Sequence, residues 1–172
     1  MEFSGKKVTV VGTGISGIGA VGLLNAVGAE VVLYDGNEKL KIEDIEKKLG
    51  TYKAEIVLGE LTKELTDSSD LLVISPGVPI DSPVVKAFEA AGVPVWGEVE
   101  LAYAFDKGKV LAITGTNGKT TTTALVGQIV GAYHKDTFVV GNIGNPYTTE
   151  VLKSNKDYYT VAEISSFQLE TV

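Results

Sequence analysis

The chain has 172 residues, of which 44% are hydrophobic, and it carries a formal net charge of −7. This length suits one ample domain, or one small domain followed by part of another. The acidic balance gives no basic surface for nucleic acid, and the absence of cysteine excludes disulfides and thiolate metal sites. The N-terminus has no signal-peptide pattern and no apolar run approaches about 18 residues, so we expect no membrane partner and a cytoplasmic location.

The first half opens with a strand–helix–strand unit. Residues 7–11 predict a buried strand, residues 18–27 a helix and residues 30–35 a second strand. Between the first strand and the helix, Gly12–Gly17 fits the pattern G-x-G-x-x-G, which allows a tight turn, close approach of a phosphate and packing of helix on strand. Asp35 ends the second strand, where an acid can accept hydrogen bonds from a ribose or base. The alternative is a glycine turn that packs but binds nothing.

The next segment continues the alternation of strands and helices. The pattern predicts strands at residues 54–59, 70–75 and 93–97, and helices at residues 42–49, 84–91 and 98–105. Ser75–Pro79 forms a stiff loop at the carboxyl end of a strand, where open α/β sheets bind ligands; an ordinary tight turn is the alternative. Residues 106–108 are a polar break, which we take as the boundary between domains 1–106 and 107–172.

A phosphate-binding loop follows this break. The apolar residues 110–113 predict a buried strand, and residues 123–130 predict a helix. Between them, Gly115–Thr122 contains Gly-Lys-Thr, in which glycines let backbone N–H groups point inward at a helix N-terminus. Lys119 would reach the β- and γ-phosphates, and a following threonine hydroxyl would help to hold Mg²⁺. The loop is a short variant, because Ile113 occupies the position of the usual first glycine; a threonine-rich helix cap is the alternative.

The remaining chain predicts two more strands, at residues 137–140 and 158–162, separated by a helix at residues 146–153. Glu163 follows the second of these strands. A carboxylate in this place can bind the Mg²⁺ of a nucleotide as a hard oxygen ligand, although the residues alone leave an ordinary surface glutamate equally open.

Together, these motifs resemble the Mur ligase family of bacterial cell-wall synthesis, and most closely its D-glutamate-adding branch. Four stretches carry the resemblance: Gly12–Gly17 with Asp35, Ser75–Pro79, Gly115–Thr120, and Gly141–Gly144 with Glu163–Glu170. The last stretch is the most specific. The resemblance implies an α/β chain, in which a Rossmann-like domain with a parallel sheet precedes the start of an ATP-binding α/β domain.

The resemblance also assigns expected roles to residues. It implies that the glycine turn holds the UDP part of a nucleotide substrate rather than NAD. The expected contacts to the UDP-substrate are Thr13, Gly14, Ile15, Ser16, Asp35, Gly77, Asn142, Ser165 and Gln168. The expected ATP-binding residues are Gly115, Thr116, Asn117, Gly118, Lys119, Thr120 and Thr121. Thr120 or Thr121 and Glu163 are expected to bind Mg²⁺. Lys119, through the ATP phosphates, and Glu163, through the metal, are the expected catalytic residues.

The activity implied is ATP-dependent addition of D-glutamate to UDP-N-acetylmuramoyl-L-alanine through an acyl phosphate. From the same resemblance we expect the chain to be a fragment that ends within the ATP-binding domain and is inactive alone. We expect the parent enzyme to be a monomer. The fragment, with three strands of a larger sheet in residues 109–172, is expected to be less stable there or to self-associate through its exposed strand edges.

Two other functions compete with this one. A nicotinamide-dependent oxidoreductase would explain Gly12–Gly17 and Asp35, but it leaves the phosphate-binding loop unexplained and lacks hydride-transfer residues. A non-catalytic nucleotide-binding module would explain both glycine-rich motifs without turnover. Titration with NAD and with UDP-N-acetylmuramoyl-L-alanine distinguishes the oxidoreductase from the ligase.

Overall fold

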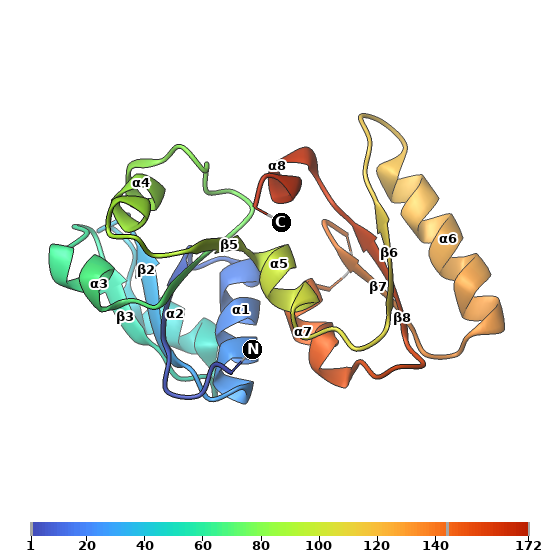
Figure 1. Cartoon of the computed structure of the whole chain (residues 1–172), viewed down its shortest axis with the longest axis horizontal. Helices are drawn as coiled ribbons and strands as arrows, with labels where there is room; N and C mark the ends of the chain where they lie inside the picture. Colours follow the sequence, from blue (N-terminus) through green and yellow to red (C-terminus); the bar gives the residue numbers. More distant parts are fainter. Residues whose placement is uncertain (1, 144, 172) are drawn as a thin grey trace.

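The first half of the protein is a five-stranded parallel sheet. A computed structural model describes residues 2–143 and 145–171, and Figure 1 shows this sheet beside a second, smaller one. The strand order is β3-β2-β1-β4-β5, which confirms the predicted Rossmann-like fold. The strands are β1 (Lys7–Val11), β2 (Glu30–Asp35), β3 (Glu55–Leu58), β4 (Leu71–Ile74) and β5 (Val95–Gly97).

Five helices accompany this sheet: α1 (Ile15–Ala26), α2 (Ile42–Leu49), α3 (Lys63–Ser68), α4 (Pro83–Ala90) and α5 (Glu98–Tyr103). Helix α1 is apolar on most sides because it packs on the sheet and also contacts α5 and a helix of the second half. It begins three residues earlier than predicted, directly after Gly14, which serves as its N-cap. The pattern did not predict α3, which buries only Leu65 and Thr66.

The second half is a three-stranded parallel sheet in the order β6-β8-β7. Its strands are β6 (Lys109–Ile113), β7 (Thr137–Gly141) and β8 (Tyr159–Glu163), and its helices are α6 (Lys119–Tyr133), α7 (Tyr147–Glu150) and α8 (Ser166–Leu169). Helix α6 extends beyond the predicted residues 123–130 at both ends. The predicted helix 146–153 is α7 followed by a 3₁₀ turn, Val151–Lys153. No helix in the described residues is both long and apolar enough to cross a membrane.

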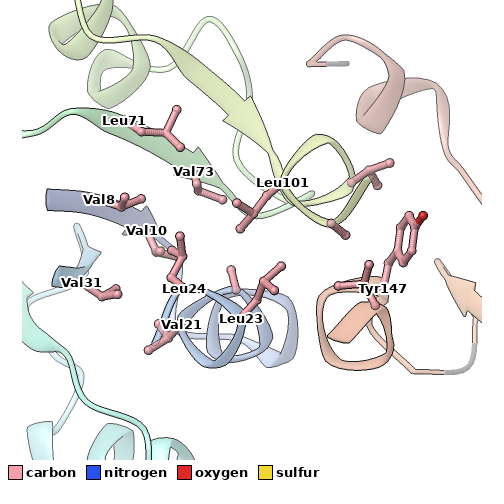
Figure 2. Close-up of a cluster of buried hydrophobic side chains, with 14 of the residues drawn as sticks. Val8, Val10, Val21, Leu23, Leu24, Val31, Leu71, Val73, Leu101 and Tyr147 are labelled. Carbon is pink, nitrogen blue, oxygen red and sulfur yellow. The ribbon is translucent and has the colours of Figure 1, made fainter. Parts of the chain in front are cut away.

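A single hydrophobic cluster runs from the first sheet into the second. Figure 2 shows Leu23 of α1 and Leu101 of α5 in this cluster, with Tyr147 of α7 on the side of the second sheet. Val140 and Ala162, from β7 and β8, belong to the same cluster. The two sheets therefore share a core across α1, α5 and α7, which lie between them in Figure 1.

Candidate functional site

The glycine turn Gly12–Gly17 joins the carboxyl end of β1 to the start of α1. Gly12 has a φ of +105°, a conformation that side chains disfavour. At Gly17 a Cβ would overlap the carbonyl oxygen of Gly12, so α1 packs directly against the turn. At Gly14, in contrast, a Cβ would meet nothing within 4 Å. The first and third glycines are thus required by the backbone, whereas the second leaves an open approach to the helix N-terminus.

Asp35 holds this turn in place from the end of β2. Its carboxylate accepts hydrogen bonds from the backbone N–H of Thr13 at 3.3 Å and from the Thr13 hydroxyl at 3.0 Å. The other carboxylate oxygen accepts from the N–H of Asn37 at 3.1 Å. Asp35 therefore has a structural role that its position at a strand end did not reveal, and its contact with the UDP-substrate stays a prediction.

A groove of about 610 Å³ lies beside the turn, between the two halves of the molecule. Gly14 and Ile15 line it at the start of α1, and Lys48 and Tyr52 line it from α2 and the residues that follow. From the second half it is lined by Asn145, Pro146, Thr149 and Glu150. The Ile15 side chain is 79% exposed. The ammonium group of Lys48 lies 3.4 Å from the Thr13 carbonyl oxygen, to which it donates. The sequence pattern predicted a helix at residues 42–49 but did not single out Lys48.

The loop Ser75–Pro79 follows β4 on the same edge of the sheet. Gly77 is exposed there. The hydroxyl of Ser75 is buried between Gly12 and Gly17 and has no hydrogen-bond partner among the described residues. The predicted substrate-binding loop and the glycine turn are therefore in direct contact.

The phosphate-binding loop has the backbone that the sequence predicts. Gly115 and Gly118 have φ values of +147° and +78°, and Gly118 is the N-cap of α6 without a side-chain capping bond. The N–H groups of the first turn are therefore free to bind an anion. The ammonium group of Lys119 donates to the carbonyl oxygens of Gly115 at 2.7 Å and Thr116 at 3.5 Å.

Other predicted ATP-binding residues lie around this lysine. Asn117, Thr120 and Thr121 are exposed, with the two threonines on the first turn of α6. The loop and the first turn of α6 therefore carry one cation, uncapped backbone N–H groups and exposed hydroxyls. This set of groups suits a polyphosphate.

Glu163 is a buried carboxylate at the end of β8, the strand paired with the one that leads into this loop. It ends β8 opposite Ile113 of β6, and it is 2% exposed. One carboxylate oxygen accepts from the side-chain amide of Asn142 at 3.1 Å, while the other is buried without a partner among the described residues. An unpaired buried oxygen is costly, and a carboxylate oxygen is a ligand type that a hard cation such as Mg²⁺ accepts. No set of three or more His, Asp or Glu side chains that could hold a metal occurs within residues 2–143 and 145–171.

Ser165 and Gln168 are occupied by a capping box at the start of α8. The Ser165 hydroxyl accepts from the Gln168 N–H at 3.3 Å, and the Gln168 side chain accepts from the Ser165 N–H at 2.9 Å. Asn142, a predicted contact to the UDP-substrate, is exposed and donates to Glu163, a predicted metal ligand. The two predicted sites are therefore adjacent at this point. Gly144, which belongs to the same motif, lies outside the described residues.

Two buried or hydrogen-bonded acidic residues lie in the seam, the contact between the two sheets. No pattern in the sequence singled them out. Glu98 at the start of α5 is 5% exposed, and burial raises the pKa of its carboxyl group, against the opposing effect of hydrogen bonds. Asp106 lies in the predicted polar break and accepts from the hydroxyls of Tyr147 at 2.6 Å and Thr160 at 2.8 Å. Its other oxygen accepts from the N–H of Gly108 at 2.7 Å. The break is therefore fixed to the second sheet, and only its polarity was visible in the sequence.

Comparison with known proteins assigns both halves of the chain. Residues 6–97 match the family "Mur ligase MurD-like, N-terminal domain", and residues 113–171 match "Mur ligase middle domain". The whole chain is 69% identical to a UDP-N-acetylmuramoylalanine–D-glutamate ligase of Lachnospira eligens and 57% identical to one of Lachnoclostridium phytofermentans. The chain spans 38% of the length of each of these relatives.

Solved structures show the same fold. A pseudomurein peptide ligase type C from Methanothermus fervidus is 25% identical with a TM-score of 0.51, over 94% of this chain and 33% of its own. A UDP-N-acetylmuramate:L-alanyl-gamma-D-glutamyl-meso-diaminopimelate ligase from Neisseria meningitides has a TM-score of 0.55 at 20% identity, over 93% of this chain and 52% of its own. With a family match over more than half of its residues, the chain belongs to the Mur ligase family.

Proposed function

We propose that this chain is the part of an ATP-dependent amide ligase that binds the UDP-substrate and the phosphates of ATP. The whole reaction proposed is the addition of D-glutamate to UDP-N-acetylmuramoyl-L-alanine in peptidoglycan synthesis. The observation that carries it is the pairing of an uncapped phosphate-binding loop with the buried, half-satisfied carboxylate of Glu163. The names of the relatives that match the whole chain supply the substrates.

Residues 1–106 would bind the UDP-substrate, with Thr13, Gly14, Ile15, Ser16, Asp35 and Gly77 near the nucleotide. The open backbone at Gly14 and the adjoining groove between the halves support this assignment. Asn142, Ser165 and Gln168 would face the muramoyl-alanine end. For the last two, the capping box limits the proposal to groups that it leaves free, such as the side-chain NH₂ of Gln168.

Residues 107–172 would bind the phosphates of ATP. Lys119 would exchange its bond to the Gly115 carbonyl for a phosphate oxygen, and Thr120 or Thr121 and Glu163 would hold Mg²⁺. When bound, Mg²⁺ supplies positive charge that offsets the charge of the phosphates. Asn142 would keep the Glu163 carboxylate oriented through its amide.

The chemistry proposed has two steps. The terminal carboxylate of the UDP-substrate attacks the γ-phosphorus of ATP, which forms an acyl phosphate and releases ADP. The amine of D-glutamate then attacks the acyl carbon, and inorganic phosphate leaves as the amine loses a proton. In the first step, Lys119 and the N–H groups at the start of α6 would stabilise the transferring phosphoryl group, and the two halves would hold the reactants in line.

Calorimetric titration of this chain tests the proposal. We expect UDP-N-acetylmuramoyl-L-alanine to bind and NAD not to bind, and we expect Lys119→Ala to weaken MgATP binding at least about tenfold, since each lost charge-assisted contact is worth about 1.5–3 kcal/mol. Lys135→Ala, at the opposite end of α6, is the matched control and should leave MgATP affinity within about twofold. Binding of NAD in place of the UDP-substrate would support an oxidoreductase instead, and equal effects of the two lysine variants would refute the phosphate site.

A further inference from the structure

Glu98 is a buried carboxylate in the seam between the two sheets. It is the first residue of α5, directly after the N-cap Gly97, and only 5% of it is exposed. Helix α5 contacts both α1 and α7. Glu98 therefore lies where the glycine-turn half and the phosphate-loop half meet.

The carboxyl group of Glu98, in the first half, accepts a hydrogen bond from the second half. Its Oε1 accepts from the hydroxyl of Thr148, in the first turn of α7, at 3.0 Å. Thr148 follows the Gly141–Pro146 segment that carries Asn142, whereas α5 packs on α1, the helix that begins at the glycine turn.

The packing around these bonds is close. A Cβ at Gly19 of α1 would approach the Thr148 hydroxyl to 2.7 Å and the Thr149 methyl group to 3.2 Å. Helices α1 and α7 therefore touch through a glycine, which leaves little room for sliding. A buried carboxylate costs several kcal/mol of desolvation, which an apolar residue of similar volume would avoid. The benefit of a carboxylate here is that it accepts a directed hydrogen bond across the contact between α5 and α7.

We infer that Glu98 is a positioning residue, which fixes α5, and with it the adjoining helix α1, in register with α7 and the Asn142 segment through Thr148. This inference rests on the proposed function for its consequence: a UDP-substrate that spans both halves requires a fixed distance between them. An apolar residue at position 98 would preserve the packing between the halves but release the Thr148 hydroxyl. The halves would then sample several relative placements.

Spin-label distance measurement tests this directly, because the chain has no cysteine to remove. Labels at Glu64→Cys on α3 and Gln128→Cys on α6, both exposed positions, report the separation of the halves. We expect one narrow distance distribution for the parent and for Glu98→Gln, which keeps an acceptor oxygen and the volume. We expect a broader or shifted distribution for Glu98→Leu and for Thr148→Val. Glu100→Leu, in the same helix, is the matched control and should stay narrow.

UDP titration of the same variants gives the functional readout. We expect Glu98→Leu to weaken UDP binding about tenfold, within the usual range of coupling between sites, and Glu98→Gln to remain within about twofold. Narrow, unshifted distances for both Glu98→Leu and Thr148→Val would overturn the inference, and so would equal distributions for Glu98→Leu and Glu100→Leu. If the parent binds no UDP, the proposed function fails, but the distances still decide the role of Glu98.

Discussion

Gly17→Ala is the substitution that most directly tests how the glycine turn is built. The added Cβ would overlap the Gly12 carbonyl oxygen, a backbone atom that cannot rotate away, and would lie 3.2 Å from the Ser75 hydroxyl. Overpacking of this kind typically costs about 1–3 kcal/mol and occasionally more. Alanine recovers up to about 1 kcal/mol through its higher helix propensity. Because the contact is to backbone, we take the upper end and expect a net loss of about 2 kcal/mol.

The matched control is Gly14→Ala, three residues earlier in the same turn. A Cβ there meets nothing within 4 Å, and replacing an N-cap glycine with alanine costs no more than about 1 kcal/mol, because alanine is the poorer cap. Urea unfolding followed by far-UV circular dichroism measures both variants. For a chain of this size, about 2 kcal/mol corresponds to a fall in Tm of roughly 4–8 °C. A Gly17→Ala loss within about 0.5 kcal/mol of the control would refute the close packing of α1 on Gly12.

Three further predictions concern the seam and the second sheet. Burial raises the pKa of the Glu98 carboxyl group above its ordinary 4.5. The stabilisation of the folded protein by the protonated form is therefore complete below about pH 4.5 and is lost as the pH rises through the folded-state pKa. The urea midpoint should fall over this pH range, and it should fall less in Glu98→Gln, which does not titrate. Asp106→Ala removes the acceptor of three hydrogen bonds and should cost about 3 kcal/mol in urea unfolding, whereas Asp136→Ala, at an exposed site, should cost less than about 0.5 kcal/mol. Backbone amides of β6, an edge strand, should exchange hydrogen faster than those of β1, a central strand. If the chain self-associates through this edge, the association measured by sedimentation should weaken in Leu111→Lys, which places a charge on β6.

Most strands could be predicted from the sequence because parallel strands are buried on both faces. Runs such as residues 7–11 and 30–35 are continuous, rich in valine and bounded by glycine or charge, and their limits match β1 and β2. Helix α3 could not be predicted in the same way. Its six residues bury only two side chains, too few for a helical period, and its start depends on the Thr62 hydroxyl accepting from the Leu65 N–H.

The candidate sites divide along a similar line. Gly12–Gly17 and Gly115–Lys119 are local motifs, and the structure gives both of them the turn that their glycines indicate. Glu98 and Asp106 depend on partners that lie 41 to 54 positions away in the chain, so no local pattern could identify them. Asp35 shows the intermediate case, since its place at a strand end was visible but its bonds to Thr13 were not.

The distribution of acids in the seam explains how two sheets can share a core and still keep one arrangement. The hydrophobic cluster that joins α1, α5 and α7 is stabilising but has no direction, so it would tolerate small rotations of one sheet against the other. The carboxylates of Glu98 and Asp106 each accept hydrogen bonds from hydroxyl groups of the second half, with oxygen–oxygen distances of 2.6–3.0 Å. Such a rotation would break these bonds, because hydrogen bonds depend on distance and angle. One acid acts beside the glycine turn and the other at the base of β6. Two fixed points at separate places along a seam oppose rotation as well as sliding, which a single polar contact could not do.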